Sequence, residues 1–408
     1  MTALVETAPR LRDNADFRRV LLAGVISKFG TQVSYLAVPL VAVTTLSAGP
    51  GQVGLLGVAG TVAWLLVGLP AGAWIDRMRR RRVMVVTDLV RAALFASIPV
   101  AWWLGGLTLT QLYLVVFLAG IATVFFDVSN QSLLPSVVGR ESLTAANSVL
   151  VGTDSVLAVG GRSGAGGLVS IVGAPAAVLV DAVGYLWSAL FVARVKTPDV
   201  LPERTARTSL PREVKAGISF VARHPVLRPI ATAGTLGNIS ASILLTMLPV
   251  FFVGERKLSE GLLGVFLAVG AVGALIGATL AGRLVARFGR RRTLAGVALV
   301  CMPFVLAVPT LDGGWWLWAV AAAWLINSAK YGVDNVVGVS YRQEVTPDAL
   351  LGRMNATMRF LFTGALAVGA GLGGLIGELA GVETAMWVGA IAATVSWLPV
   401  LAIPRATR

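Results

Sequence analysis

Cysteine, histidine and charge are all scarce in this sequence. Cys301 is the only cysteine and His224 the only histidine among 408 residues, which excludes an intramolecular disulfide, a cysteine metal cluster and a histidine-based catalytic triad. Charged residues make up 13% of the chain and apolar residues 56%. A water-soluble protein of this composition would expose much apolar surface, so we expect a membrane protein with no metal and no cofactor.

Long apolar stretches are abundant instead. A helix needs about 20 mainly apolar residues to cross the hydrocarbon layer, and lipid offers no partner for an open strand edge. Twelve windows reach that length: 17–45, 52–75, 83–104, 110–133, 143–171, 174–195, 227–253, 261–285, 293–311, 315–341, 351–376 and 382–403. The predicted fold class is an all-α polytopic membrane protein with 12 transmembrane helices.

Basic residues gather on one side of these spans. Of 34 Lys and Arg residues, 27 lie in the terminal segments and in the loops that follow even-numbered spans, whereas the opposite loops hold only Arg256 and Lys257. The positive-inside rule therefore places both termini in the cytoplasm. The formal net charge of +14 is a topological signal that also attracts anionic lipid, and it indicates no nucleic-acid partner.

A polar stretch divides the chain near its middle. It contains Pro198, Pro202 and Pro211, and the apolar positions that follow predict a short interfacial helix lying on the membrane. Six spans lie on each side. The predicted domains are an N-terminal six-helix bundle over 1–195, a cytoplasmic linker over 196–226 and a C-terminal six-helix bundle over 227–408.

The two halves share sequence motifs at a nearly constant offset. Gly72–Arg82 is echoed by Gly282–Arg292, 210 residues later. The offset is 208 for a second set, in which Val137, Leu143 and Asn147 correspond to Val345, Leu351 and Asn355. Both pairs fall in corresponding loops, which is typical of parallel repeats related by an axis along the membrane normal.

These motifs identify a family. The chain resembles a major facilitator superfamily transporter over essentially its whole length, because Gly72–Arg82 matches the cytoplasmic loop motif Gly-x-x-x-Asp-Arg-x-x-Arg-Arg-Arg. Finer marks resemble the branch of macrolide efflux pumps and the enterobactin exporter: Asp88-Leu-Val-Arg91, Leu134-Pro135 through Asn147, Asp181-Ala182, and Arg342-Gln343 through Ala356. The resemblance implies two pseudo-symmetric six-helix bundles that rock about a central cavity.

Three positions depart from that branch. The branch usually has an acidic residue soon after the glycine in the first span, where this chain reads Ser27-Lys28-Phe-Gly30-Thr31. Arg162-Ser163 stands where antiporters tend to have Gly-Pro in the fifth span. Ala286 replaces the Asp of the second loop motif, which leaves one complete acidic motif. The first two departures bear on the substrate and on the coupling mechanism.

The loop motif implies a cytoplasmic latch made of Gly72, Asp76, Arg77 and Arg80. Asp76 ends the second span, and the resemblance implies that the first turn of span eleven lies nearby, where the helix dipole favours a carboxylate by about 0.3–1 kcal/mol. In the resembled fold, Asp76 and Arg80 hold the halves together in the outward-open state and release on inward opening. The alternative is a solvated loop whose arginines only set the topology.

Charged residues inside the predicted spans are the main functional candidates, because a charge at mid-membrane costs about 2.5 kcal/mol or more. They are Lys28, Asp127, Asp154, Arg162, Asp181, Lys330, Asp334 and Arg359. In the resembled fold, spans one, four, seven and ten line the cavity. The predicted substrate-binding or proton-coupling residues are Lys28, Asp127, Arg162, Asn238, Lys330, Tyr331 and Asp334.

Each of these charges also has a structural interpretation. Lys330 and Asp334 are four residues apart on one helix face, so they can form an ion pair that only holds span ten in place. Lys28 can likewise pair with Asp127 between two helices.

Two further charges keep alternative interpretations. Arg162 is either a substrate anchor or the partner of Asp154, and Asp181 is expected to be structural. For proton coupling, an Asp whose lysine partner moves away during rocking would take up a proton and release it on rejoining. Asp127 and Asp334 suit this role.

The predicted function is proton-driven export of a small amphiphilic molecule, such as a drug, siderophore or secondary metabolite. An importer or lysolipid transporter on the same fold, and a non-transporting membrane receptor or scaffold, are the alternatives. We expect no enzyme, since no nucleophile–base pair or Walker motif is present. The 29 Arg against 5 Lys favour a bacterial cell (inner) membrane, where a monomer would contact substrate, protons and the lipid bilayer.

Overall fold

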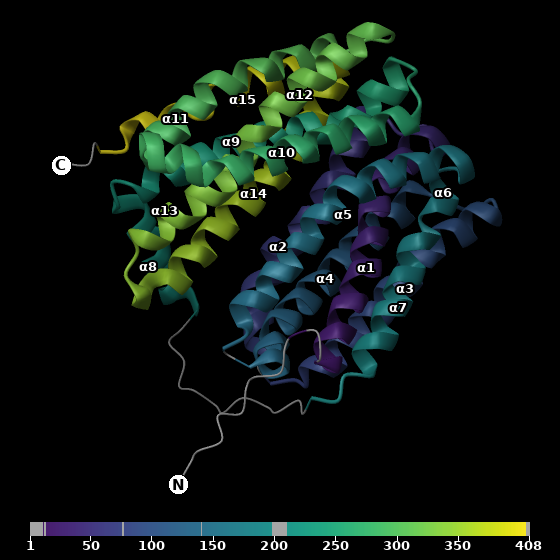
Figure 1. Ribbon diagram of the computed structural model, residues 1–408. Coiled ribbons are helices and arrows are strands. Elements are labelled where there is room, and N and C mark those ends of the chain that lie inside the picture. The colour runs from purple at the N-terminus through teal and green to yellow at the C-terminus, as the bar shows by residue number, and fades with distance from the viewer. Residues whose placement is uncertain (1–10, 12–13, 76, 140, 198–209, 405–408) are drawn as a thin grey trace.

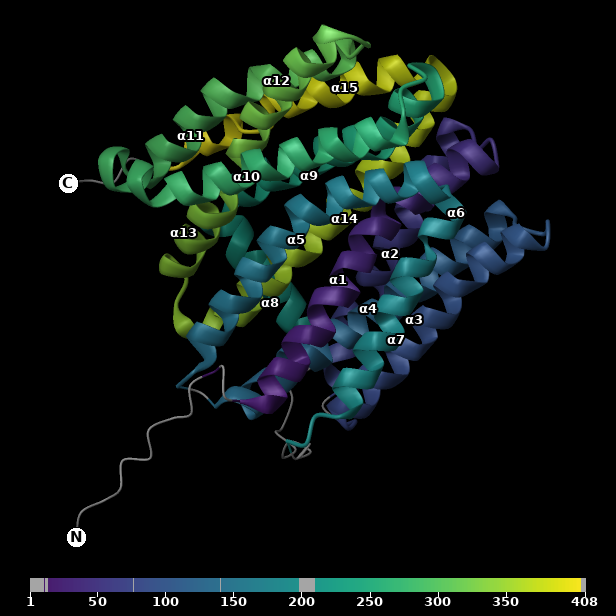
Figure 2. The same cartoon turned by 45° about the vertical axis from the view of Figure 1, so that its right-hand side comes forward.

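The computed structural model describes residues 11, 14–75, 77–139, 141–197 and 210–404. Every regular element in these ranges is a helix, and the helices form two groups (Figure 1). The groups meet at one end of the molecule and diverge toward the other, where α7 ends and α8 begins. A turned view shows the same arrangement, with the first half of the chain on one side and the second half on the other (Figure 2).

The N-terminal half carries six long helices. Their bounds, with those of two short elements, are α1 (Ala15–Leu40), the π-helix η1 (Val41–Thr45), α2 (Pro50–Ile75), α3 (Arg80–Trp103), α4 (Leu109–Val138), α5 (Leu143–Val172), α6 (Ala174–Ala177) and α7 (Leu179–Ala193).

The C-terminal half repeats this order after one additional helix. Its elements are α8 (Leu210–Arg223), α9 (Leu227–Pro249), η2 (Val250–Glu255), α10 (Glu260–Phe288), α11 (Arg290–Cys301), η3 (Met302–Thr310), α12 (Trp315–Val333), η4 (Asp334–Gly338), α13 (Val339–Glu344), α14 (Asp348–Ala380), α15 (Val382–Val395) and η5 (Leu398–Ala402).

Eleven helical segments of the described chain are long and apolar enough to cross a membrane, so the protein is a multi-pass membrane protein. The predicted window 315–341 is not among them. It is occupied by α12, η4 and α13, and four tryptophans, Asn327 and Lys330 lower the mean hydropathy of α12. The all-α polytopic fold is confirmed, while the count of 12 spans stays a prediction.

The first long helices of the two halves end in the same way, 210 residues apart. Pro39 and Pro249 each lack an N–H donor, and the π-helices η1 and η2 follow them. Ser47 and Lys257 then adopt φ of 51° and 55°, and they are the described non-glycine residues with positive φ. The halves thus repeat an unusual backbone conformation as well as sequence motifs.

Two glycine crossings join the halves at the end where they meet. A Cβ added to Gly54 of α2 would lie 2.5 Å from the Cα of Gly374 on α14. A Cβ added to Gly166 of α5 would lie 2.7 Å from the Cα of Gly264 on α10. The crossings are equivalent, because Gly54 and Gly264 are 210 residues apart and Gly166 and Gly374 are 208 apart. Only glycine lets these backbones touch.

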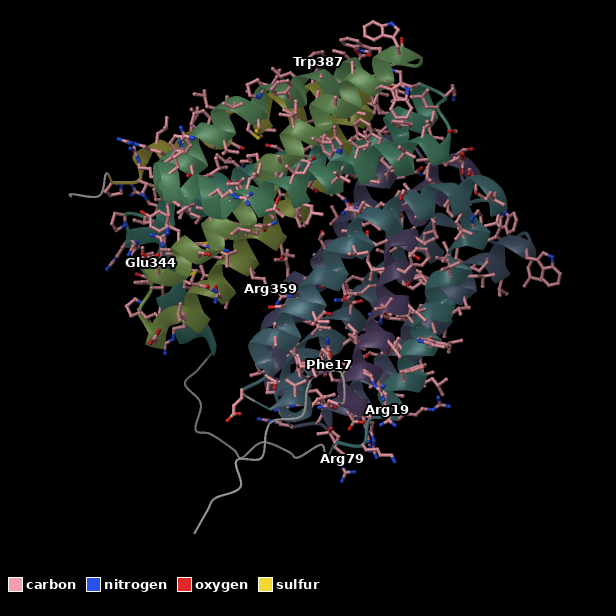
Figure 3. The ribbon with its side chains drawn as sticks, in the orientation of Figure 1. Phe17, Arg19, Arg79, Glu344, Arg359 and Trp387 are labelled. Atoms are coloured by element: carbon pink, nitrogen blue, oxygen red, sulfur yellow. The ribbon has the colours of Figure 1, made fainter. Side chains whose placement is uncertain are left out.

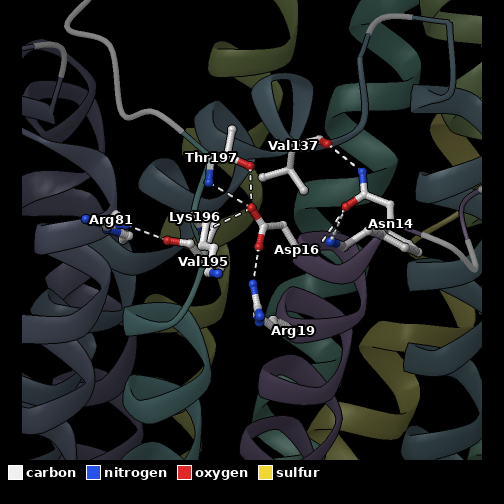
Figure 4. A network of polar contacts seen from close by, with 9 residues as sticks. Asn14, Asp16, Arg19, Arg81, Val137, Val195, Lys196 and Thr197 are labelled. Atoms are coloured by element: carbon white, nitrogen blue, oxygen red, sulfur yellow. Dashed lines mark hydrogen bonds and ion pairs between the residues drawn. The ribbon is translucent and has the colours of Figure 1, made fainter. Parts of the chain in front are cut away.

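A polar cluster ties the start of α1 to the end of α7 (Figure 4). Asp16 Oδ2 accepts hydrogen bonds from the backbone N–H of Lys196 (3.0 Å) and Thr197 (2.7 Å) and from the Thr197 hydroxyl (2.7 Å). Asn14 caps α1 and donates to the Val137 carbonyl at 2.8 Å. The cluster fixes the position at which the chain leaves α7.

A short helix, α8, occupies the segment predicted to be interfacial and packs against α14, while its place at the membrane surface stays a prediction. A Cβ added to Gly217 would lie 2.5 Å from Thr357 Oγ1, so the glycine permits this contact. His224 follows α8, and its Nδ1 accepts hydrogen bonds from the backbone N–H groups of Val226 (3.2 Å) and Leu227 (3.3 Å) at the start of α9. His224 therefore caps α9, a role that its lone occurrence in the sequence does not suggest.

This cap predicts a pH-dependent stability. Only unprotonated Nδ1 can accept a hydrogen bond, and burial lowers the pKa of His224. The stabilisation is therefore present above about pH 6.5 and is lost as the pH falls through the lowered pKa. At about pH 8, His224→Ala is expected to lose about 1 kcal/mol of unfolding free energy.

Thermal unfolding of the detergent-purified protein measures this effect. His224→Asn keeps a side-chain acceptor that does not titrate, so its unfolding midpoint should fall less on acidification than that of the unmodified chain. Identical pH profiles for the two proteins would contradict the capping role.

Candidate functional site

A cavity of about 430 Å³ lies at the junction of the two halves. Its wall is mainly aliphatic and contains the rings of Tyr35, Trp64, Phe95 and Tyr185. Six hydroxyl side chains also line it: Thr31, Ser34, Thr61, Thr123, Ser242 and Thr246. Asp181 is the one Asp or Glu among the lining residues. A cavity of this size and polarity suits a small, largely apolar ligand.

The cavity wall differs in part from the prediction. Helices α1, α4 and α9, which correspond to spans one, four and seven, contribute lining residues, as do α2, α3, α7, α10 and α14. Helix α12, the predicted fourth wall, contributes none. The cavity is therefore not lined by the predicted residues at the C-terminal side of α12, which are Lys330, Tyr331 and Asp334. Asn238 on α9 does not line it either, and its Nδ2 donates to the Gly234 carbonyl of its own helix at 2.7 Å.

Lys28 pairs with Asp154 rather than with Asp127. The ion pair joins α1 to α5, and the two side chains are 46% and 48% exposed. The predicted pairing with Asp127 is wrong because Lys28 faces α5, whereas Asp127 lies on α4. A half-exposed pair between two helices can exchange partners more readily than a buried one.

Arg162 has partners other than Asp154. Its Nε donates to Gln32 Oε1 at 3.4 Å, and its Cζ lies 5.8 Å from the centroid of the Tyr35 ring, which lines the cavity. The alternative in which Arg162 pairs with Asp154 is therefore wrong. The other alternative, a substrate anchor, stays a prediction.

Asp127 lies where cations from both halves converge. Arg91 and Lys28 of the N-terminal half and Arg359 of α14 all act electrostatically on it. The Arg359 Cζ lies 3.6 Å from the centroid of the Trp64 ring, a cation–π contact between the halves. In Figure 3 Arg359 lies beside the space between the two groups of helices.

A second cavity adjoins this contact. It measures about 230 Å³ and is lined by Trp64, Leu65, Gly68, Val128, Asn355, Ala356, Arg359, Phe360 and Thr363. It lies nearer the diverging ends than the first cavity, since Gly68 is close to the end of α2 and Asn355 close to the start of α14. Trp64 lines both cavities.

Lys330 and Asp334 form the ion pair that their spacing predicts, with Nζ and Oδ2 2.7 Å apart. The lysine is buried and Asp334 begins the π-helix η4. Both residues belong to one continuous helical segment, and neither lines the central cavity. This geometry fits the structural interpretation of the pair.

The structure reveals a buried charged cluster between α3 and α7 that sequence reasoning did not select. Arg91 forms an ion pair with Asp88, and its Cζ lies 4.4 Å from the ring centroid of Phe126 and 4.2 Å from that of Tyr185. Asp181 lies one turn before Tyr185 and is fully buried. The spacing of three residues between Asp88 and Arg91 is a sequence signal for an ion pair on one helix face, whereas the closeness of Asp181 has no such signal.

The predicted latch is only partly described. Asp76 lies outside the described residues, and Gly72 lies in the last turn of α2. Arg77 is exposed, and Arg80 donates to the Ser132 carbonyl of α4 at 2.9 Å, within its own half. The latch therefore remains a prediction. Among the described residues, no group of three His, Cys, Asp or Glu side chains could hold a metal ion.

Comparison with known proteins gives the family. The model of the Major Facilitator Superfamily matches residues 20–333 and 257–408. The chain is 27% identical over 374 residues to y4rN, an uncharacterized MFS-type transporter of Sinorhizobium fredii, covering 88% of this chain and 87% of that protein. It is 26% identical over 380 residues to the multidrug efflux pump Tap of Mycolicibacterium fortuitum, covering 89% and 90%.

Solved structures share the fold. A bacterial homologue of the iron transporter ferroportin in its inward-facing state is 19% identical and gives a TM-score of 0.76, with 95% of this chain and 98% of that chain covered. The outward-facing state of such a homologue gives 0.62. The family model matches along the chain, and the structure has two helical halves with repeated backbone features and a cavity at their junction. This protein therefore belongs to the Major Facilitator Superfamily and is a membrane transporter.

Proposed function

We propose that this protein is a proton-coupled antiporter that exports a small amphiphilic molecule by alternating access. The observation that carries the proposal is the cavity of about 430 Å³ at the junction of the halves, with its aromatic wall and scattered hydroxyls. Such a surface binds by apolar contact and needs few directed hydrogen bonds, which suits amphiphiles of varied structure. The similarity to Tap, a multidrug efflux pump, supports the same substrate class.

The arrangement of the halves corresponds to one step of this cycle. With both termini in the bacterial cytoplasm, as the basic residues indicate, the diverging ends face inward and the two glycine crossings close the outer side. The ferroportin homologue gives a higher TM-score in its inward-facing state, in agreement. The Gly72–Arg82 loop would latch the halves in the opposite state.

The charged residues divide into two groups in this mechanism. Asp127, Arg359 and the Lys28–Asp154 pair lie between the halves or at half-exposed positions, where their contacts change as the halves rock. Lys330–Asp334 instead joins two residues of one helical segment and lines neither cavity. We assign coupling to the N-terminal half, with the protein acting as a monomer in the bacterial cell membrane.

Transport in membrane vesicles tests the proposal. Inside-out vesicles with an acidic interior should accumulate a lipophilic dye, and collapse of the pH gradient should release it. Right-side-out vesicles should show no such accumulation. Accumulation in right-side-out vesicles only would favour an importer, and no flux of any amphiphile or lysolipid would favour a receptor or scaffold.

Trp64 provides a matched variant. Trp64→Ala removes an aromatic wall from both cavities and the contact with Arg359, so the apparent affinity for the dye should fall about tenfold, equivalent to about 1.4 kcal/mol. The control is Trp103→Ala, since Trp103 is 83% exposed at the end of α3 and lines neither cavity. Equal losses in the two variants would contradict the assignment of the cavity.

A further inference from the structure

The buried cluster of α3 and α7 has one cation for two carboxylates. Asp88, Arg91, Asp181 and Tyr185 are 0%, 4%, 0% and 2% exposed. Asp88 takes the direct ion pair with Arg91. Asp181 has no cation of its own in hydrogen-bonding contact, and in a bilayer an uncompensated charge at such depth is costly. A proton bound to one carboxylate would make the cluster neutral.

The surroundings of Asp181 indicate that it is the carboxylate that takes the proton. Thr31 Oγ1 lies 3.5 Å from Asp181 Oδ1 and 3.2 Å from the Tyr185 hydroxyl, and Ser34 also faces the carboxylate. Asp181 Oδ2 is buried with no hydrogen-bond partner in the described chain. Hydroxyls donate to a carboxylate and accept from a carboxylic acid, so they can accompany either form.

Within the described residues, the helices that pack against α7 give Asp181 no cation besides Arg91. Helix α7 packs against α1, α3 and the short α6. The ionisable groups that act on Asp181 are Arg91 from α3 and Tyr185 from its own helix, while α1 provides the hydroxyls and α6 contains only alanine and proline. Arg91 also acts on Asp127 of α4, which Lys28 and Arg359 compensate in addition. Asp88 also has an unpartnered oxygen, but Arg91 already compensates its charge.

The fold itself does not require this cluster. At the offset of 210 residues, Ala298 and Cys301 of α11 correspond to Asp88 and Arg91, and at 208 residues Gly389 of α15 corresponds to Asp181. The C-terminal half builds the same helices with these small uncharged residues. The charges of the N-terminal half are therefore an addition to the scaffold, placed beside the cavity that Asp181 and Tyr185 line.

We propose that Asp181, with the Asp88–Arg91 pair as its counter-charge, binds and releases the proton that drives transport. The assignment rests on the proposed proton-coupled export and moves the coupling residue from Asp127 or Asp334 to α7. Proton binding neutralises the cluster, and proton loss leaves one net negative charge in the wall of the cavity. The Asp181 side chain therefore attracts Arg91 and the hydroxyls of α1 more strongly when it has lost the proton than when it is protonated.

Purified protein in liposomes tests this assignment. Asp181→Asn keeps the shape of the side chain but cannot lose a proton, so accumulation of dye driven by a pH gradient should fall at least about tenfold. Exchange of dye at equal pH on the two sides should persist. Asp127→Asn and Asp334→Asn carry the same change at the two carboxylates that the sequence favours. Retained gradient-driven accumulation in Asp181→Asn, with loss in either of the others, would overturn the proposal.

A chemical measurement on the unmodified chain tests the same assignment and does not require Asp181→Asn to fold. Dicyclohexylcarbodiimide modifies protonated carboxylic acids in apolar surroundings, so mass spectrometry should find the adduct on the peptide that contains Asp181, less at high pH. An adduct on Asp127 or Asp334 and none on Asp181 would overturn the proposal. If the unmodified protein shows no gradient-driven accumulation, proton-coupled export fails as a whole, a result distinct from failure at Asp181 alone.

Discussion

Gly166→Leu is expected to abolish transport while the protein stays folded. A leucine at this position would displace α10 from α5, because even a Cβ at Gly166 lies 2.7 Å from the Gly264 Cα and 3.0 Å from the Gly261 carbonyl oxygen. In the proposed transport cycle, the crossing exists only in the state in which the halves meet at this end. Overpacking costs about 1–3 kcal/mol, which shifts the equilibrium between the two states by about 5–150-fold.

Two measurements check this shift. Dye transport should be lost, and spin labels at the exposed Thr110 and Asp312, in a Cys301→Ala background, should report longer distances between the halves. The control is Gly167→Leu, since a Cβ at Gly167 meets no atom within 4 Å. Unchanged label distances in Gly166→Leu would show that this crossing does not hold the halves together. Gly54→Leu should reproduce the effect at the equivalent crossing.

Gly277→Ala is expected to destabilise the C-terminal half by about 3 kcal/mol or more. A Cβ at Gly277 of α10 would overlap the carbonyl oxygen of Ala329 on α12, and a Cβ at Gly332 would overlap that of Ala274. The two backbones are in contact along this stretch, so neither helix can move aside without losing its packing. A single methyl group therefore has an unusually large effect.

Gly282→Ala is the matched control in the same helix. A Cβ at Gly282 meets no atom within 4 Å, and alanine is the better helix former by about 1 kcal/mol. Its thermal unfolding midpoint should be equal to or higher than that of the unmodified chain, while that of Gly277→Ala should fall sharply, with loss of monodisperse protein on size exclusion. Similar midpoints for the two variants would disprove the close contact of α10 and α12.

Local sequence patterns predicted the structural features that depend on residues close together in the sequence. Lys330 and Asp334 pair as predicted because residues four apart share a helix face whatever the fold does elsewhere. The short helix before the C-terminal half is present as α8. The motif offsets of 208 and 210 recur in the glycine crossings and in the φ values of Ser47 and Lys257. Each of these features is encoded within one segment or repeated between two.

Pairs between distant helices could not be predicted in the same way. Lys28 lies 126 residues from its partner Asp154, and the choice between Asp154 and Asp127 depends on how α1 is rotated about its axis. Asp181 is expected to be structural from the sequence because it begins the family-like Asp181-Ala182 segment. Arg91 and Thr31 reach it from other helices. The assignment of α12 to the cavity wall is wrong for a related reason, because the place of α12 relative to the cavity depends on its close packing on α10.

The sequence by itself determined that the chain crosses a membrane many times as two related halves, since hydropathy over about 20 residues and the placement of arginines act segment by segment. Tertiary structure alone decided which charges are buried together and which line the cavity. Helix rotation and crossing distance follow from contacts between glycines and small side chains that lie tens to hundreds of residues apart. No single span contains that information, and it is what brings Asp181 beside Arg91.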